Sequence, residues 1–418
     1  MTPDEFARRR QALLDSLPDK SLLVLFSGSA PALSRDIPHR FSVNRNFYYL
    51  TGLDRENLIL LLARGGGRTA QTLFLERPDP EREKWTGARL RPAAATAVSG
   101  LAGIRFCDEF HAALADIIRR AEYEFLYADL DRQTWDGDPA PDFAFARGAR
   151  ERYPHLCVKN AGPAVADLRI VKSAGEIAQI REAIAITRRG IEAVWRHARP
   201  GAMEYELEAH FHFELHSRGV REHAFPAIVA SGPNAAVLHY EANDRCAGEG
   251  ELILLDLGAQ AGHYCADISR TFPAGGRFQD RQRALYDIVL QAELSVIAMV
   301  RPGVTRQELN DAAKRFLAAG LRRVGLIESE SDVSRYYYHS IGHHLGLDAH
   351  DVGDSERPLE AGMVFTIEPG LYIEQEGIGI RIEDDVLVTE TGCDVLSQDI
   401  LKTADEIEAF MAGAGSGR

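Results

Sequence analysis

Two aspartates occupy neighbouring apolar stretches of the segment ELILLDLGAQAGHYCADISRTF, which begins at Glu251. A two-residue turn at Ala261-Gly262 would place Asp256 directly opposite Asp267 in an antiparallel hairpin, with Cβ atoms about 4.5–5.5 Å apart on one face. Two ionised carboxylates at that separation repel each other and lose solvation, so this register predicts a cation between them or a shared proton. A longer hairpin with another register would leave one aspartate in a solvated turn.

Two glutamates add to this pair. Glu368 follows the apolar run MVFTI and Glu383 follows GIRI, and acids in such surroundings are seldom buried unless they are paired. Together with the two aspartates they carry four negative charges, which two divalent cations would cancel. A pair of ions roughly 3.5–4 Å apart is the arrangement that activates water for hydrolysis. The alternative without chemistry is a buried network of these carboxylates around Arg381, which shares a strand face with Glu383 at i, i+2.

The segment YHSIGHHLGLDAHD supplies His339, His343, His344 and His350. Of these, His343 is the expected nitrogen ligand. Oxygen donors with one imidazole suit Mn²⁺, and Co²⁺ or Zn²⁺ are the alternatives. The five cysteines are scattered and show neither a CxxC pair nor a zinc-finger spacing. Cys265 lies two residues before Asp267 and shares its predicted strand face, and its role stays open.

The overall charge and the apolar runs limit the classes of partner. The 418 residues include 48 basic and 62 acidic side chains, a net charge of −14, without a cluster of lysine and arginine that would bind nucleic acid. The longest apolar runs, such as SLLVLF from Ser21, are strand-length and predict no membrane span. The N-terminus MTPDEFARRRQALL predicts an amphipathic helix without a secretory signal, so a cytoplasmic location is expected.

Periodicity predicts two domains of different character. The first part alternates short apolar strands with helices: a helix to about Leu17, strands at 21–27, 58–63 and 71–76, and helices near 109–121 and 140–152. We predict an α/β domain over residues 1–168, a second domain over 169–412 and a flexible tail at 413–418. Ser173 with Glu176 three residues later predicts a capping box at the start of the second domain's first long helix.

The second domain is predicted to be α+β. Its expected helices cover 173–197, 203–217, 279–300 and 305–318, and its expected strands cover 252–258, 264–272, 363–368 and 379–389. Helices interleaved with antiparallel hairpins, without regular βαβ alternation, favour this class.

These motifs in this order resemble the metal-dependent pita-bread peptidases, and within them the aminopeptidase P and prolidase branch, which cleaves bonds involving proline. The motifs are VLHY at His239, LLDLG and ADISRTFP, HSIGHHLGLDAHDVG, MVFTIEPGLYI with Tyr372, and GIGIRIEDDVLVT. The N-terminal half also resembles aminopeptidase P, in NRNFYYLTGL from Asn44 and WTGARL from Trp85. The resemblance implies an α+β chain with an N-terminal α/β domain and a C-terminal pita-bread catalytic domain.

The resemblance also implies a role for each matching residue. Its metal ligands fall on Asp256, Asp267, His343, Glu368 and Glu383. Asp267 and Glu383 would bridge two divalent ions, most simply Mn²⁺, whose shared hydroxide attacks the scissile carbonyl. Glu368 would also carry the proton.

The remaining matches concern the substrate. His239 and His350 would contact the substrate and stabilise the tetrahedral intermediate, and His339 and Tyr372 would lie near the proline ring. Arg381 would hold ligands or substrate in place. Family members with such an N-terminal domain commonly form homodimers or homotetramers, so a homo-oligomer is expected.

The expected activity is release of the N-terminal residue from peptides with proline in second position. A prolidase acting on Xaa-Pro dipeptides and a proline-specific carboxypeptidase are the alternatives on this fold. The creatinase branch lacks the metal ligands retained here, and an inactive binding module would have lost them. Two departures from the family pattern affect specificity: the segment Glu374-Gln375-Glu376 is shorter than in some aminopeptidases P, and His344 stands where an aromatic residue is frequent.

Overall fold

The computed structural model describes residues 1–35, 37–120, 122–131 and 141–415. The chain divides into two compact units, Met1–Arg169 and Ile170–Arg418. Both contain helices and strands, and the predicted α/β domain followed by an α+β domain is confirmed. Within the described residues, no helix combines the length and apolar composition needed to cross a membrane.

The N-terminal unit is built on one six-stranded mixed sheet with the order β4-β3-β2-β1-β5-β6. Its strands are β1 (Ser21–Phe26), β2 (Ile59–Gly65), β3 (Arg68–Leu75), β4 (Ile104–Phe106), β5 (Phe125–Ala128) and β6 (Cys157–Asn160). Its helices are α1 (Pro3–Ser16), α2 (Arg45–Thr51), α3 (Pro80–Thr86), α4 (Pro92–Ser99), α5 (Phe110–Arg120), α6 (Pro141–Arg152) and α7 (Gly162–Arg169). Leu22 and Val24 of β1 pack against Phe110 and Leu114 of α5, so every second strand residue faces this core.

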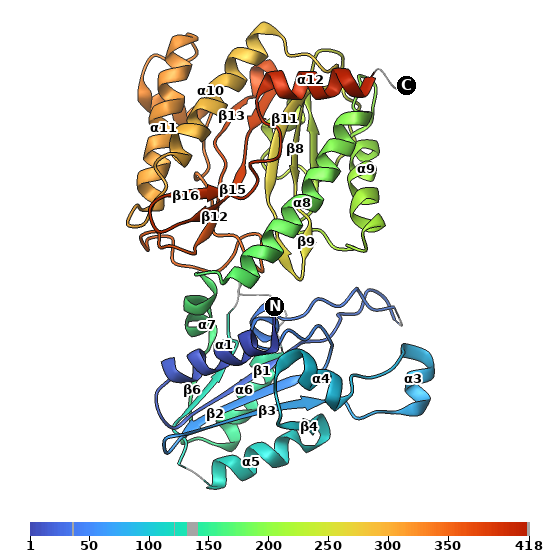
Figure 1. Cartoon of the computed structure of the whole chain (residues 1–418), viewed down its shortest axis with the longest axis vertical. Helices are drawn as coiled ribbons and strands as arrows, with labels where there is room; N and C mark the ends of the chain where they lie inside the picture. Colours follow the sequence, from blue (N-terminus) through green and yellow to red (C-terminus); the bar gives the residue numbers. More distant parts are fainter. Residues whose placement is uncertain (36, 121, 132–140, 416–418) are drawn as a thin grey trace. The chain divides into compact units, whose positions relative to one another are not determined.

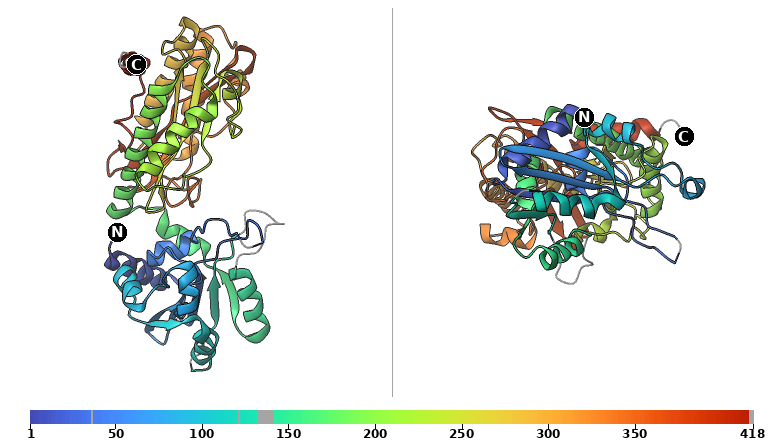
Figure 2. Two further views of the ribbon diagram at one scale, coloured as in Figure 1. Left: turned by 90° about the vertical axis from the view of Figure 1, so that its right-hand side faces the viewer. Right: turned by 90° about the horizontal axis from the view of Figure 1, so that it is seen from below.

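The C-terminal unit has two halves of similar make-up. In one, helices α8 (Ala174–His197) and α9 (Glu204–Ser217) accompany the antiparallel strands β7 (Ile228–Ser231), β8 (Leu252–Leu257) and β11 (Ile268–Pro273). In the other, α10 (Asp280–Ile297) and α11 (Arg306–Arg323) accompany β12 (Val364–Ile367), β15 (Asp384–Val388) and β16 (Cys393–Val395). Figure 1 shows the strands flanked by one helix pair on each side, and α8 runs alongside them in Figure 2 as well.

Short elements complete this unit. They are β9 (Gln260–Ala261), β10 (Tyr264–Cys265), β13 (Gly370–Ile373), β14 (Ile378–Arg381) and α12 (Ala404–Gly415), with 3-10 turns η1 (Cys107–Glu109) in the first unit and η2 (Gly232–Ala236), η3 (Glu330–Arg335) and η4 (Glu374–Glu376) in the second. The predicted capping box is present, because Ser173 accepts from the Glu176 backbone and the Glu176 side chain accepts in return. Helix α12 continues through Gly415, past the predicted start of the tail at 413, and residues 416–418 lie outside the described residues.

The hairpin that carries the two aspartates has a different register from the predicted one. Its two-residue turn is Gly262-His263, with φ of 53° and 65°, so that Tyr264 pairs with Ala261. Positive φ at both central residues is typical of the type I′ turn, whose twist matches that of the flanking strands. The turn therefore lies one residue later than predicted.

This later turn changes the partner of each aspartate. Asp256 pairs with Ser269, and the prediction that it pairs with Asp267 is wrong. Asp267 lies two residues before Ser269, however, and residues two apart in an extended strand share a face. The register differs by an even number of residues, so both carboxylates still face the same cavity.

Candidate active site

Four carboxylates reach one cavity because strands of both halves end around it. Asp256 lies in β8, Asp267 immediately before β11, Glu368 immediately after β12, and Glu383 between β14 and β15. The predicted strand 379–389 is thus interrupted at this glutamate. Several hydrogen bonds join the halves. Among them, the Glu383 N–H donates to Ser269 O at 3.1 Å, and Thr271 Oγ1 exchanges hydrogen bonds of 3.1 Å with the Arg381 backbone.

The cavity has a volume of about 540 Å³. Its polar lining contains nine of the ten residues predicted from the sequence: Asp256, Asp267, His343, Glu368, Glu383, His239, His339, His350 and Arg381. The tenth, Tyr372, is buried beside this lining, and its hydroxyl lies 2.8 Å from His339 Nε2 and accepts from Arg381 Nη1 at 3.1 Å.

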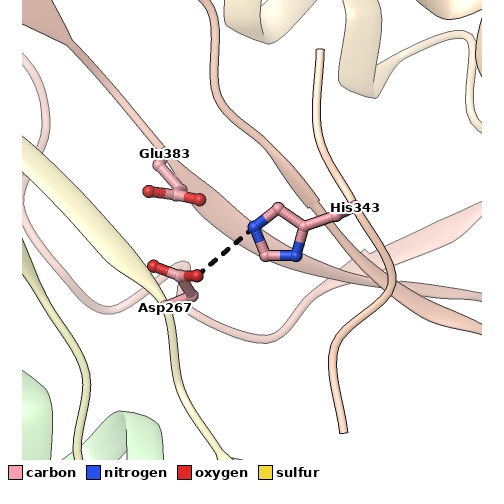
Figure 3. A group of neighbouring side chains, drawn as sticks. All are labelled: Asp267, His343 and Glu383. Atoms are coloured by element: carbon pink, nitrogen blue, oxygen red, sulfur yellow. Dashed lines mark ion pairs between the residues drawn. The ribbon is translucent and has the colours of Figure 1, made fainter. Parts of the chain in front are cut away.

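Asp267, His343 and Glu383 each offer a ligand atom, and these three atoms all lie within 4.8 Å of one another (Figure 3). His343 Nε2 lies 3.4 Å from Asp267 Oδ2, the contact marked in the figure, and 3.6 Å from Glu368 Oε1. Burial and, to a smaller extent, the neighbouring His350 together lower the pKa of His343 to about 3, so the ring is neutral. These spacings suit a cation between the groups better than a direct ion pair.

The lone pair of His343 points into the site because its other ring nitrogen is already used. Nδ1 lies 3.1 Å from the carbonyl oxygen of His344 and therefore carries the proton. The backbone of His344 thus orients the neighbouring imidazole, which a histidine ligand requires. The His344 side chain itself is 2% exposed, and burial lowers its pKa to about 4. Cys265 is also buried, and its thiol donates to Leu347 O at 3.8 Å.

The four carboxylates have far less positive charge around them than they need. Among the residues that the structure describes, Arg381 is the one lysine or arginine side chain paired with them, through Nη2 and Asp256 Oδ2 at 2.6 Å. Asp256 Oδ1 is buried and has no hydrogen-bond partner within the described part of the chain. A network around Arg381 alone therefore leaves about three negative charges uncompensated, whereas divalent cations would balance them.

Burial and mutual repulsion shift the acid pKa values strongly. Burial, followed by the charges of Glu383 and Asp256, raises the pKa of Asp267 well above its usual range. Burial likewise raises the pKa of Glu383, and Glu368 adds to this shift. The pKa of Glu368 rises to about 7, again mainly by burial, although Arg381 opposes the shift. Without cations these groups would hold protons, which metal binding must displace.

Two hydroxyl groups that the sequence analysis did not single out hold the ligands. Ser269 Oγ donates to Glu383 Oε2 at 2.7 Å and accepts from Arg381 Nε at 2.7 Å. Thr366 Oγ1 accepts from the His343 backbone at 3.1 Å and donates to Glu368 Oε1 at 3.4 Å. Each lies two residues from an acid of the site, so the strand alternation that marked the acids could have found them.

The residues that form the apolar wall of the cavity were not identified from the sequence. It consists of Phe225, Pro226, Ile228 and Leu238. His239 and His350 are exposed at the cavity lining, and the His343 ring packs against that of His350 with centroids 3.9 Å apart and an interplanar angle of 43°. The arrangement combines a strongly anionic floor, imidazoles and an apolar wall.

Comparisons with known proteins agree with this geometry. The model of metallopeptidase family M24 matches residues 178–390, and that of the aminopeptidase P N-terminal domain matches residues 6–127. The Xaa-Pro aminopeptidase of Escherichia coli is 34% identical over 98% of both chains, and human Xaa-Pro aminopeptidase 3 is 31% identical over 98% of this chain and 86% of its own length.

Solved structures of aminopeptidase P are also similar to this chain. An aminopeptidase P-like protein from Bacillus anthracis superposes with a TM-score of 0.97 at 47% identity, covering 99% of both chains. Aminopeptidase P from E. coli with the inhibitor Pro-Leu superposes with a TM-score of 0.91 at 32% identity, covering 100% of this chain and 99% of its own. The chain therefore belongs to metallopeptidase family M24, with the aminopeptidase P N-terminal domain, and is a hydrolase of the metallo-exopeptidase class.

Proposed function

We propose that this enzyme removes the N-terminal residue from peptides that carry proline in second position, with two divalent ions held by Asp256, Asp267, His343, Glu368 and Glu383. The observation that carries the proposal is the convergence of four carboxylates, two of them buried and two half-buried, with one arginine partner among the described residues. Bound ions would supply Lewis acidity and a lowered pKa for a coordinated water. Mn²⁺ suits this oxygen-rich set, with Co²⁺ or Zn²⁺ as alternatives.

The chain's own residues supply proton transfer and orientation. Glu368 is the candidate proton carrier, because its carboxylate lines the cavity beside the other proposed ligands, within reach of a coordinated water. Arg381 holds Asp256 directly and Glu383 through Ser269, which fixes both carboxylates before substrate arrives. His239 and His350 offer imidazoles to the substrate from the cavity lining.

The choice of proline has a physical basis. An Xaa-Pro bond has no N–H, so a site that reads that hydrogen gains nothing from it, whereas an apolar wall can take the pyrrolidine ring. Phe225, Ile228 and Leu238 form such a wall here. The names of the E. coli and human relatives support the same substrate class.

A substrate series tests this proposal. The chelated enzyme is reloaded with Mn²⁺, Co²⁺ or Zn²⁺ and given Xaa-Pro-Yaa, the dipeptide Xaa-Pro and an N-blocked peptide ending in proline. We expect the tripeptide to be cleaved and the blocked peptide to resist. Cleavage of the dipeptide alone would establish a prolidase, and cleavage of the blocked peptide would establish a carboxypeptidase. The homodimeric or homotetrameric state and the cytoplasmic location stay predictions.

A further inference from the structure

Glu204 is a fully buried acid outside the cavity described above. It is the first residue of α9, and its carboxylate is surrounded by uncharged hydrogen-bond donors of the chain. Moving a carboxylate out of water is costly unless the protein replaces the lost hydrogen bonds. The residues that donate to Glu204 therefore show what this acid holds in place.

The donors that compensate for this burial come from one segment, residues 231–245. Ser231 donates its N–H at 2.6 Å and its hydroxyl at 2.8 Å to Oε1 of the carboxylate, and Asn234 Nδ2 donates to the same oxygen at 3.2 Å. The Tyr240 hydroxyl and the Arg245 N–H donate to Oε2 at 2.8 and 2.9 Å. One carboxylate thus connects both ends of the segment and two points between them.

The same segment carries His239, which lines the cavity. The residues on either side of this histidine are held in place. Leu238 and Tyr240 both pack against a core cluster that includes Ile228 and Tyr372, and Tyr240 is fixed in addition by its hydrogen bond to the buried acid. The backbone that presents the imidazole therefore depends on this hydrogen bond.

The Tyr240 hydroxyl has one proton and two carboxylates within reach. Glu204 Oε2 lies at 2.8 Å and Asp244 Oδ1 at 3.1 Å, and the Asp244 N–H donates to the hydroxyl at 3.3 Å. Asp244 is exposed and water can solvate it, whereas Glu204 is buried, so the proton belongs to the contact with Glu204. Burial, followed by this hydrogen bond, raises the pKa of Tyr240, which keeps the hydroxyl a donor.

We propose that Glu204 is a positioning residue for His239, because its carboxylate holds segment 231–245 so that the imidazole faces the substrate. The inference rests on the proposed function, which assigns His239 to the substrate. An anion suits this place, since the N-terminus of a helix favours negative charge. A carboxylate has acceptor oxygens only, which match the surrounding donors, whereas a glutamine amide would turn N–H groups towards other donors.

A double-mutant cycle on kcat/KM tests the inference, with whichever peptide of the substrate series the wild type cleaves. Glu204→Gln keeps the size of the side chain and breaks the match with its donors. We expect kcat/KM to fall about 10- to 100-fold, because misplacement of a group by about 1 Å has effects of this size. In a His239→Ala background the same change should lower kcat/KM less than about twofold, since the two residues act as one unit.

Two further variants sharpen the cycle. Tyr240→Phe keeps the ring and removes its hydrogen bond, so we expect a fall of about three- to tenfold that also depends on His239. Glu176→Gln is the matched control, because Glu176 is likewise buried and accepts from a tyrosine hydroxyl, that of Tyr264, at 2.9 Å. Any effect of this control should be equal with and without His239.

Amide hydrogen exchange gives a readout that needs no substrate. Exchange at residues 232–242 should be faster in Glu204→Gln than in the wild type and unchanged in Glu176→Gln. The metal content of Glu204→Gln should equal that of the wild type, because none of the proposed ligands belongs to the segment.

The inference is overturned if exchange at residues 232–242 is the same in Glu204→Gln and wild type, or if this variant loses metal. It is also overturned if Glu204→Gln lowers kcat/KM equally with and without His239. A wild type that cleaves none of the peptides would overturn the proposed function instead, and the exchange rates would still decide whether Glu204 holds the segment.

Discussion

At the scale of single residues, the hydroxyl group of Ser269 fixes the position of a carboxylate in the site. Ser269 is fully buried and stands between Glu383 and Arg381, donating to one and accepting from the other. A hydroxyl can do both at once, and neither an alanine nor a second carboxylate could. Ser269 therefore connects the arginine to a predicted metal ligand without adding charge.

The variant Ser269→Ala should lose both contacts. We expect about 10- to 100-fold lower metal affinity or kcat, because outer groups that orient metal ligands have effects of this size. The free energy of unfolding should fall by only about 1–3 kcal/mol. Steady-state kinetics and urea unfolding measure the two effects. Ser334→Ala is the control, because that exposed hydroxyl donates only to Ser331 O, and equal activity of both variants would contradict this role.

Glu368 makes the metal-free protein sensitive to pH. Its pKa is about 7 in the folded chain, mainly through burial, and lower in the unfolded chain. The folded state therefore binds more protons between these values, and the stability of the metal-free protein falls as pH rises from about 4.5 to 7. The raised pKa values of Asp267 and Glu383 act in the same direction.

The variant Glu368→Gln removes this titration. We expect chelator-treated wild type to lose stability on the order of a few kcal/mol from pH 5 to pH 7, and the variant to lose less. Urea unfolding at the two pH values measures the difference. Parallel stability curves for the two proteins would show that Glu368 does not titrate in this range.

The element that presents His343 depends on a close approach of two backbones. The loop before β12 is hydrogen-bonded to that strand, since the Thr366 N–H donates to His343 O at 2.9 Å. A Cβ added to the preceding Gly342 would lie 1.9 Å from Thr366 O. Only glycine leaves room for this contact, so the side chain of His343 reaches the carboxylates because its neighbour has none.

The variant Gly342→Ala should displace the loop. We expect a loss of about 1–3 kcal/mol in the free energy of unfolding, the usual cost of overpacking, together with reduced metal content after dialysis. Thermal unfolding and elemental analysis provide the two measurements. Gly392→Ala serves as the control, because a Cβ there meets no atom within 4 Å. A Gly342→Ala protein with full metal content would exclude this account.

The two units of the whole molecule should respond differently to metal. All five predicted ligands lie in Ile170–Arg418, and none lies in Met1–Arg169. A cation that binds only the folded state stabilises it by about 2.7 kcal/mol when its free concentration is 100 times the Kd. Metal removal should therefore destabilise the C-terminal unit and leave the intrinsic stability of the N-terminal unit unchanged.

Differential scanning calorimetry with and without a chelator checks this expectation. We expect the transition of the C-terminal unit to move to lower temperature and that of the N-terminal unit to stay in place. The variant Asp267→Asn should show little response to the chelator. Equal shifts of both transitions would place a metal contribution outside the predicted ligands.

Local sequence patterns were enough to identify the acids of the site, the start of α8 and the order of helices and strands. Lone acids in apolar strand runs marked Asp256, Asp267, Glu368 and Glu383, because a carboxylate there has to be compensated. The capping residues of α8 marked its start, and periodicity gave the helix and strand pattern of both units. These features depend on residues a few positions apart, which the sequence shows directly.

The tertiary structure decided two features that depend on contacts between distant segments: the strand register and the apolar wall of the cavity. The turn at Gly262-His263 set the strand register and made Ser269, not Asp267, the partner of Asp256. The apolar wall with Phe225 joins the site only through the folding of the chain, and no periodicity links it to the carboxylates. Strand register depends on turn conformation, and cavity walls depend on packing between distant segments, so neither could be read from local pattern.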